Sequence, residues 1–400
     1  MAVVAMCVAL VVPTACTPGS SETEGTQSPS SGAACTNKET SSGADGDFIA
    51  KTVRDYANKE GLTSVVYRVA RDGELIAARA VGDTVTGVPA TQQMHFRNGN
   101  VAFAYMGTLL LLMAEAGVLR LDDPVSKWLP AWNLPNADKV TLRMLVYSTS
   151  GYPDYVPDET FDKALLSDPF QQMTPRRLLG YAFRTPPLYA PGTGWNYAHT
   201  NYVILGAALE AVGKKPLGEL LTEKVIAPMG LENTRPVLTP EVPEPVLHSF
   251  NTERGVYEDA TYWNPSWQTA PGSVIATNIC DMLVSAEKVG TGALLSRASF
   301  DQMLTPEKGE LGPVPAGCTV CRQFDEHQFY GAGVLVRSGW IHQTPLFGGA
   351  GAVHAYLPSA KLAVAMVAVS GKTSKPGVNH AVNIWTALAE KLTPDNVPGR

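Results

Sequence analysis

The sequence has no window rich in Lys or Arg, and charged residues of both signs make up only 17% of its 400 positions. A nucleic-acid partner, which needs a basic patch, is therefore excluded. No period between about 20 and 50 residues recurs, which excludes a repeat architecture. The hydrophobic fraction of 45% instead indicates a large folded core, and the length predicts two or three units of about 150 residues.

Signatures of several other catalytic and cofactor sites are also missing. The sequence contains no G-x-S-x-G elbow, HExxH pair, P-loop or Rossmann fingerprint. No second Cys-x-x-Cys and no nearby His pair completes a zinc site with Cys318 and Cys321. We therefore expect neither a cofactor nor a metal ion.

A short apolar run marks the N-terminus. Residues 2–12 are eleven consecutive apolar residues, a length typical of a signal peptide and too short to span a membrane. Residues 13–16 (PTAC) resemble a bacterial lipobox, which implies that residues 1–15 are removed and that Cys16 carries a lipid. This predicts a lipoprotein anchored to the outer face of the bacterial cytoplasmic membrane, in the cell envelope. The alternative is an ordinary secretory signal.

The next segment predicts a tether. Eighteen of the 29 residues at 17–45 are Ser, Thr, Gly or Pro, and none is Val, Ile, Leu, Met, Phe, Tyr or Trp. Such a segment has no apolar area to offset the entropy of ordering, so residues 16–45 are expected to be a lipidated Cys followed by a disordered tether.

The remaining cysteines allow three full pairings among Cys35, Cys280, Cys318 and Cys321. Outside the cytoplasm they are expected to be oxidised. The spacing of Cys318 and Cys321 also occurs in redox motifs, but no strand and helix flank it, which favours a structural loop disulfide.

Residues 46–393 form the predicted body, and its pattern indicates an α+β fold. An amphipathic helix at 47–60 precedes a hairpin at 63–82 that turns at Asp72-Gly73. Strands return at 330–370, and a helix at 376–393 closes the chain. We expect one antiparallel sheet built from both termini and flanked by helices (46–95 plus about 251–393), with an inserted, mainly helical subdomain (about 96–250). The apolar stretch 101–118 contains Glu115 and is read as a buried helix rather than a membrane span.

Several segments then resemble a known superfamily, the serine β-lactamases and penicillin-binding proteins. The similarity is to the branch of class C β-lactamases, D-Ala-D-Ala carboxypeptidases and related esterases, in the family's order along residues 47–393. The segments that carry it are 96–99 (FRNG), 119–125 (LRLDDPV), 145–154 (LVYSTSGYPD), 191–202 (PGTGWNYAHTNY) and 270–277 (APGSVIAT). The resemblance implies a β-lactamase/transpeptidase-like fold and a cleft with three catalytic clusters.

The catalytic positions depart from the family pattern in all three clusters. The family's Ser and Lys, one helical turn apart so that the amine can take the hydroxyl proton, correspond to Asn100 and Phe103. Tyr197 matches the family Tyr, and His199 replaces an Asn. Counting back from the turn at Pro358 places the third cluster at Gln343-Thr344-Pro345, where only Thr344 fits. The resemblance therefore implies a degenerate site with no catalytic residues.

Other residues could supply a catalytic group, but a structural role is expected for most of them. The literal S-x-x-K at 285–288 is expected on a surface helix, the K-T-S at 372–374 in a loop, and Ser148 and Ser150 in turns. His342 would face the cleft only if the strand register slipped by one residue. His199 with Tyr197 could act as an acid–base pair only by activating water directly.

We expect Phe103, Trp195 and Tyr197 to converge in a cleft that is more apolar than a working site. The backbone N–H groups of Asn100 and Leu346 resemble the family's oxyanion donors. The interpretation is a non-catalytic envelope pseudoenzyme that binds a cell-wall (peptidoglycan) fragment, a small apolar ligand or a protein partner. The alternative is a hydrolase of β-lactams, D-Ala peptides or esters that uses an unrecognised catalytic group.

Overall fold

A computed structural model describes residues 35–307, 309 and 312–399 of the chain. The predicted signal peptide, the lipidation site at Cys16 and residues 17–34 of the tether lie outside these residues.

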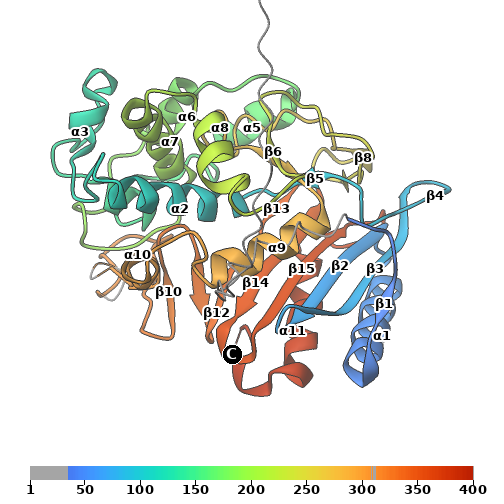
Figure 1. Ribbon diagram of the computed structural model, residues 1–400. Helices are drawn as coiled ribbons and strands as arrows, with labels where there is room; N and C mark the ends of the chain where they lie inside the picture. The colour runs from blue at the N-terminus through green and yellow to red at the C-terminus, as the bar shows by residue number, and fades with distance from the viewer. Residues whose placement is uncertain (1–34, 308, 310–311, 400) are drawn as a thin grey trace, which may run out of the picture. The chain divides into compact units, whose positions relative to one another are not determined.

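One large antiparallel sheet draws its strands from both ends of the chain (Figure 1). Its strands, in spatial order, are β1 (Thr40–Ser41), β3 (Glu74–Val85), β2 (Ser64–Arg71), β15 (Leu362–Val369), β14 (Ala350–Leu357), β12 (Trp340–Gln343), β11 (Leu335–Arg337) and β10 (Gln328–Tyr330). Two short strands extend it: β4 (Val88–Pro89) pairs with β3, and β13 (Leu346–Phe347) pairs with β14. The N- and C-terminal halves meet where β2 pairs with β15. The predicted α+β class, with a sheet built from both termini, is confirmed.

The predicted hairpin forms because its turn suits its residues. Asp72 and Gly73 both have positive φ, 52° and 79°, as the two central residues of a type I′ turn require. The strands on either side are β2 and β3, which pair from Arg71↔Glu74 outward.

Helices cover both faces of the sheet. Because successive side chains of a strand point to opposite faces, Val65 and Tyr67 of β2 pack with α1 (Gly43–Glu60) and α11 (His380–Leu392), whereas Val66 belongs to the second core under α9 (Ile279–Gly290). Figure 1 shows α9 lying across this second face, between the sheet and the helical part of the chain.

The helical part lies between strands β5 and β6 in the sequence. It comprises α2 (Val101–Glu115), α3 (Val125–Trp128), η1 (Pro130–Trp132), α4 (Leu142–Val146), α5 (Glu159–Ser167), α6 (Pro175–Ala182), α7 (His199–Gly213), α8 (Leu217–Leu221) and the π-helical turn η2 (Thr222–Ile226). Small sheets join it to the rest: β5 (Phe96–Arg97), β9 (Ile275–Thr277) and β6 (Arg235–Pro236) form one, and β7 (Phe250–Asn251) and β8 (Glu258–Asp259) form another. Later come α10 (Arg297–Met303), η3 (Pro358–Ala360) and η4 (Pro394–Asn396).

The apolar stretch at 101–118 forms the buried helix that the sequence predicts. Nearly every residue of α2 is buried, and Glu115 ends it at the surface. Among the described residues, no helix combines the length and the apolar character needed to cross a membrane.

The predicted tether is too long at its C-terminal end, and this is a correction. Thr40 and Ser41 pair with Ala78 and Ala77 of β3, α1 already begins at Gly43, and Cys35 is disulfide-bonded to Cys280. These polar residues bury little apolar area, but backbone pairing with an edge strand and a covalent bond replace that contribution. The body also extends past 393, because Trp340 Nε1 donates to the Asn396 carbonyl at 2.7 Å.

Candidate active-site cleft

The first cleft residue lies at the start of α2. Just before the helix, the Asn98 N–H donates to the Ile275 carbonyl at 3.0 Å, which holds the chain against β9. Gly99 follows with a φ of +54°, a value that favours glycine, and Asn100 then caps α2. The Asn100 Nδ2 donates to the Tyr197 Oη at 3.1 Å. The structure thus brings together two residues that the sequence places 97 positions apart.

Phe103 fills the place where a basic group would have to lie. It follows Asn100 by one helical turn and is 1% exposed. Its ring stacks on that of Tyr202, with centroids 3.6 Å apart and an interplanar angle of 1°. The rings of Tyr197 and His199 lie 6.1 and 5.9 Å away. An aromatic cluster therefore occupies this side of the cleft, and Phe103 supplies no proton donor or acceptor.

Tyr197 is a phenol that remains protonated. Burial, reinforced by the nearby Tyr330, holds its pKa well above the ordinary value, and the hydrogen bond from Asn100 offsets this only in part. A phenol with a raised pKa is not available as a general base near neutral pH.

His199 has a carboxylate partner that sequence reasoning missed. Its backbone N–H donates to Asp154 Oδ1 at 3.1 Å, and its Nδ1 lies 3.0 Å from Asp154 Oδ2. A carboxylate only accepts, so the proton shared with Asp154 lies on Nδ1, and in a neutral imidazole the free lone pair is then on Nε2. Asp154 lies within the segment 145–154, but no signal in the sequence connects it to a residue 45 positions later.

In the third cluster, Gln343 and Thr344 form hydrogen bonds within the fold. Gln343, at the predicted position of a cation, is fully buried, and its Nε2 donates to the Gly333 carbonyl at 2.6 Å. Thr344 is half-buried, and its carbonyl accepts from Asn379 Nδ2 at 3.3 Å. No charged group stands at either position.

Pro345 separates β12 from β13, although both pair with β14 in the same register. Proline has no N–H to donate to the ladder, but its carbonyl accepts from the Ala352 N–H at 2.8 Å. Hydrogen-bonded and non-hydrogen-bonded pairs alternate in an antiparallel ladder. The next pair, Leu346 and Gly351, is therefore non-hydrogen-bonded, and the Leu346 N–H points away from β14.

Pro345 also packs against Gly99, just before the start of α2. A Cβ added to Gly99 would lie 2.5 Å from the Pro345 Cβ, closer than real contacts allow. The two halves of the cleft are therefore packed together at this point.

A cavity of about 50 Å³ lies at this junction. Its lining includes Asn100, His199, Trp267, Gln268 and Leu346. Ligand pockets for drug-sized molecules have volumes of about 300–1,000 Å³, so this cavity admits only a small group. Its lining is mixed, with Asn100, His199 and Gln268 beside the apolar side chains of Pro345, Leu346 and Phe347.

The expected convergence of aromatic rings is only partly seen. Phe103 and Tyr197 approach each other, but Trp195 packs instead on Phe324 and Tyr330, at centroid distances of 4.5 and 5.7 Å.

Ser285 and Lys288 do not form a second catalytic pair. They lie on α9, which packs against the sheet and is not the surface helix that the sequence suggests. Ser285 is fully buried and its Oγ lies 2.9 Å from His354 Nε2, whereas Lys288 is exposed. Burial lowers the pKa of His354 to about 4, so this histidine is neutral near pH 7.

The structure also shows the surroundings of four further candidates, Ser148, Ser150, Ser374 and His342. Ser150 Oγ donates to Asn201 Oδ1 at 2.6 Å, and Ser148 has a φ of +61° within a turn. Ser374 Oγ accepts from the Gly371 N–H at 2.9 Å and closes the loop after β15. His342 does not face the cleft, because its ring packs on Trp385 of α11, 5.2 Å between centroids.

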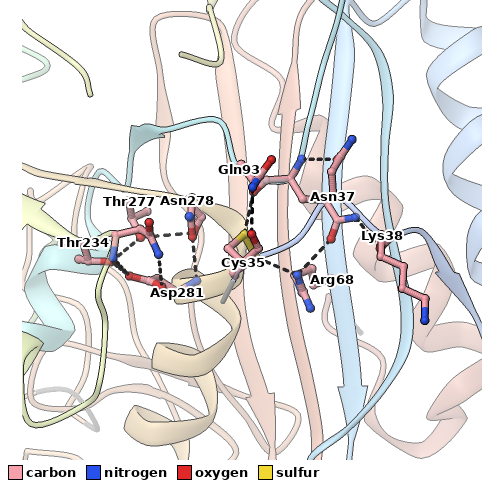
Figure 2. The surroundings of a disulfide bond; sticks show 12 residues. Cys35, Asn37, Lys38, Arg68, Gln93, Thr234, Thr277, Asn278 and Asp281 are labelled. Atoms are coloured by element: carbon pink, nitrogen blue, oxygen red, sulfur yellow. Dashed lines mark hydrogen bonds between the residues drawn. A yellow bond between two sulfur atoms is a disulfide. The ribbon is translucent and has the colours of Figure 1, made fainter. Parts of the chain in front are cut away.

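The disulfide pairing, which the sequence left open, is Cys35–Cys280 and Cys318–Cys321. The second is the loop disulfide favoured from the sequence. Figure 2 shows the first among polar groups: Gln93 Nε2 donates to the Cys35 carbonyl, and Arg68 Nη1 lies 2.8 Å from Cys280 Sγ. These contacts fix the start of the body against β2 and α9.

Comparison with known proteins identifies the family of this chain. The family described as Beta-lactamase matches residues 49–389. The chain belongs to the β-lactamase family. Its members include relatives with several activities, so membership alone does not fix a reaction.

Curated relatives within the β-lactamase family match to different extents. Esterase EstB of Burkholderia gladioli is 31% identical over 186 residues, 43% of this chain and 46% of its own length. Penicillin-binding protein 4* of Bacillus subtilis is 28% identical over 32% of this chain and 27% of its own length. The matches thus span less than half of these two relatives. A β-lactamase of Escherichia coli is 21% identical over 86% of this chain and 93% of its own length.

Solved structures share the fold of the whole body. A D-amino acid amidase from Ochrobactrum anthropi has a TM-score of 0.70 at 20% identity, covering 86% of this chain and 98% of its own. An octameric penicillin-binding protein homologue from Pyrococcus abyssi has a TM-score of 0.69 at 18% identity, covering 86% and 76%. At these identities the likeness shows the fold alone.

Proposed function

We propose that this member of the β-lactamase family is a cell-envelope lipoprotein whose domain binds a ligand or partner without hydrolysing it. The observation that supports this is that Asn100 and Phe103 occupy the start of α2, one helical turn apart, where a nucleophile and its base would have to lie. Asn100 contacts Tyr197 and Phe103 stacks on Tyr202. The ligand, a cell-wall fragment or another small molecule, and the lipid on Cys16 are parts of the same proposal.

The chemistry of these two side chains opposes an acyl-enzyme route. The lone pair of a carboxamide nitrogen is delocalised, so Asn100 is not a nucleophile comparable with a serine alkoxide. Phe103 offers no basic atom, and Tyr197 keeps its proton. In another serine hydrolase, loss of the nucleophile costs about 10⁶ in rate.

Incubation with nitrocefin, a short-chain nitrophenyl ester and a fluorescent penicillin tests the proposal. We expect no turnover above the rate of the buffer and no covalent labelling. Turnover that co-purifies with the folded chain and disappears in a cleft variant would contradict it. Mass spectrometry of the mature N-terminus tests the anchor, and an unlipidated start beyond residue 16 would contradict that part.

A second candidate function is hydrolysis by water activated at His199. It is favoured by the carboxylate that orients His199 and by relatives named as an esterase and a β-lactamase. In this route Nε2 takes a proton from water, and the hydroxide oxygen bonds to the substrate carbonyl carbon. The carbon–leaving-group bond then breaks, and the leaving group takes the proton back from Nε2.

Two variants separate the candidates. Asp154→Asn removes the negative charge that orients His199, and His199→Gln removes the base. Under the second candidate both lower ester turnover by about 10²-fold or more. Under the main proposal, neither substitution changes the rate of ester hydrolysis, which equals the rate in buffer alone.

A further inference from the structure

Three buried polar atoms of side chains that line the cavity lack a hydrogen-bond partner among the described residues. They are Asn100 Oδ1, an acceptor, and two donors, Gln268 Nε2 and Trp267 Nε1. Gln268 is 8% exposed, and all three side chains line the same cavity of about 50 Å³. Buried polar groups in native proteins are almost always paired, so this arrangement indicates a partner that carries both a donor and an acceptor.

The cavity limits the size of that partner. A water molecule needs roughly 10–15 Å³ by the same kind of measure, so the cavity of about 50 Å³ accommodates a group of about four non-hydrogen atoms. A methyl-capped planar group has this size. A larger ligand could insert only such a terminal group.

The charges around the cavity disfavour an ion. No Lys or Arg is among its lining residues, and Gln343, where the resemblance would place a cation, is committed to the Gly333 carbonyl. A carboxylate would therefore find no Lys or Arg as counter-ion in the cavity lining. An ammonium would find Asp154 already paired with His199.

We propose that the cleft receives one uncharged amide group, whose N–H donates to Asn100 Oδ1 and whose carbonyl accepts from Gln268 Nε2. A planar amide carries both functions, because its N–H donates and its carbonyl oxygen accepts. The proposal rests on the non-hydrolytic function above and names the class of ligand. Because Asn100 supplies one of the two contacts, the residue that removes the nucleophile also defines the binding site.

Titration of the purified full chain with acetamide, and separately with acetate and methyl acetate, tests this selectivity. Protein NMR shifts of the indole N–H groups, which include that of Trp267 in the cavity lining, report binding. We expect a dissociation constant for acetamide on the order of millimolar, typical of a ligand with few atoms, and at least ten-fold weaker binding of acetate and of methyl acetate, which has no N–H.

Two cleft variants and one control complete the experiment. Gln268→Leu removes the donor at similar size and is expected to weaken acetamide at least five-fold. Asn100→Leu gives the same result if the first variant fails to fold. Gln323→Leu, at an exposed position, leaves the affinity unchanged. Equal binding of acetate and acetamide, no acetamide binding at all, or unchanged affinity in a folded cleft variant would overturn the proposal.

The outcome is independent of the hydrolysis assay. Turnover of nitrocefin or an ester would contradict the non-hydrolytic function. The acetamide titration could still be interpreted, because it measures binding at equilibrium and does not depend on turnover of either substrate. Absence of turnover with no acetamide selectivity would leave the function standing and remove only the ligand class.

Discussion

At the scale of single residues, Phe103 fills the space one helical turn after Asn100 with a buried aromatic ring. It is nearly fully buried and stacked on Tyr202 at 3.6 Å. The ring does more than displace an amine, because it completes an aromatic cluster in the core of the helical part. Its role in stability can therefore be measured separately from catalysis.

Phe103→Ala should lower the free energy of unfolding by about 3–5 kcal/mol, the range for loss of a buried Phe. Urea unfolding followed by tryptophan fluorescence measures this difference. Phe170→Ala is the matched control, because Phe170 is 59% exposed, and it should change stability by less than about 0.5 kcal/mol. Equal effects of the two substitutions would contradict the packing described for Phe103.

His342 gives a second prediction, which concerns pH. Burial, with smaller contributions from Arg337 and His354, lowers its pKa from 6.5 to about 3. The unfolded chain therefore binds this proton first as the pH falls. The stability that His342 contributes is present above pH 6.5 and is lost progressively toward pH 3.

His342→Phe should remove this dependence. One pKa unit corresponds to about 1.4 kcal/mol, so between pH 7 and pH 5 the variant should gain about 2 kcal/mol relative to the original chain. Urea unfolding at both pH values measures it. His327→Gln, at an exposed surface position, should leave the pH dependence unchanged, and an equal slope in both variants would show that His342 is not the group responsible.

At the scale of elements, the contact between α2 and the β12–β13 strand closes the cleft. Gly99 and Pro345 meet there at a distance that leaves no room for a side chain. Gly99→Ala should destabilise the chain by about 1–3 kcal/mol, because it adds both a clash and a positive-φ alanine.

A double-mutant cycle isolates the clash. Pro345→Gly removes the opposing ring, so the cost of Gly99→Ala should fall by about 0.5–3 kcal/mol in that background. Chemical denaturation of the four proteins measures this coupling. Strict additivity would mean that the cost comes only from the backbone conformation of Gly99.

Local elements were predictable from the sequence, and pairings over long distances were not. The Asp72-Gly73 turn and the buried α2 depend on neighbouring residues, and both form as expected. The contact between Asp154 and His199 depends on the tertiary fold, and α9 looked exposed because its apolar face alone does not show that the sheet lies beneath it. The segment 40–45 appeared disordered because backbone pairing with a distant strand leaves no mark on composition.

At the scale of the whole molecule, the Cys35–Cys280 bond joins the start of the body to its centre across 245 residues. A disulfide that closes a long loop restricts the unfolded chain most. A chain that starts at residue 46 would lack this bond and strand β1, so both belong in any preparation of the protein.

Replacing both Cys35 and Cys280 with Ser should lower the free energy of unfolding by about 2–5 kcal/mol. The matched control is the pair Cys318→Ser and Cys321→Ser, which opens a loop with a separation of only 3 and should cost less. Denaturant unfolding under non-reducing conditions compares the two. A larger loss from the short loop would contradict the role assigned to the long-range bond.

We propose that Asn100 and Phe103 leave this β-lactamase-like cleft without a route to an acyl-enzyme. Intact mass spectrometry after incubation with a fluorescent penicillin tests it most directly, with a penicillin-reactive relative treated in parallel. We expect an unchanged mass for this chain and a penicilloyl adduct on the relative. A stoichiometric adduct on the folded chain, mapped to a cleft residue, would contradict it.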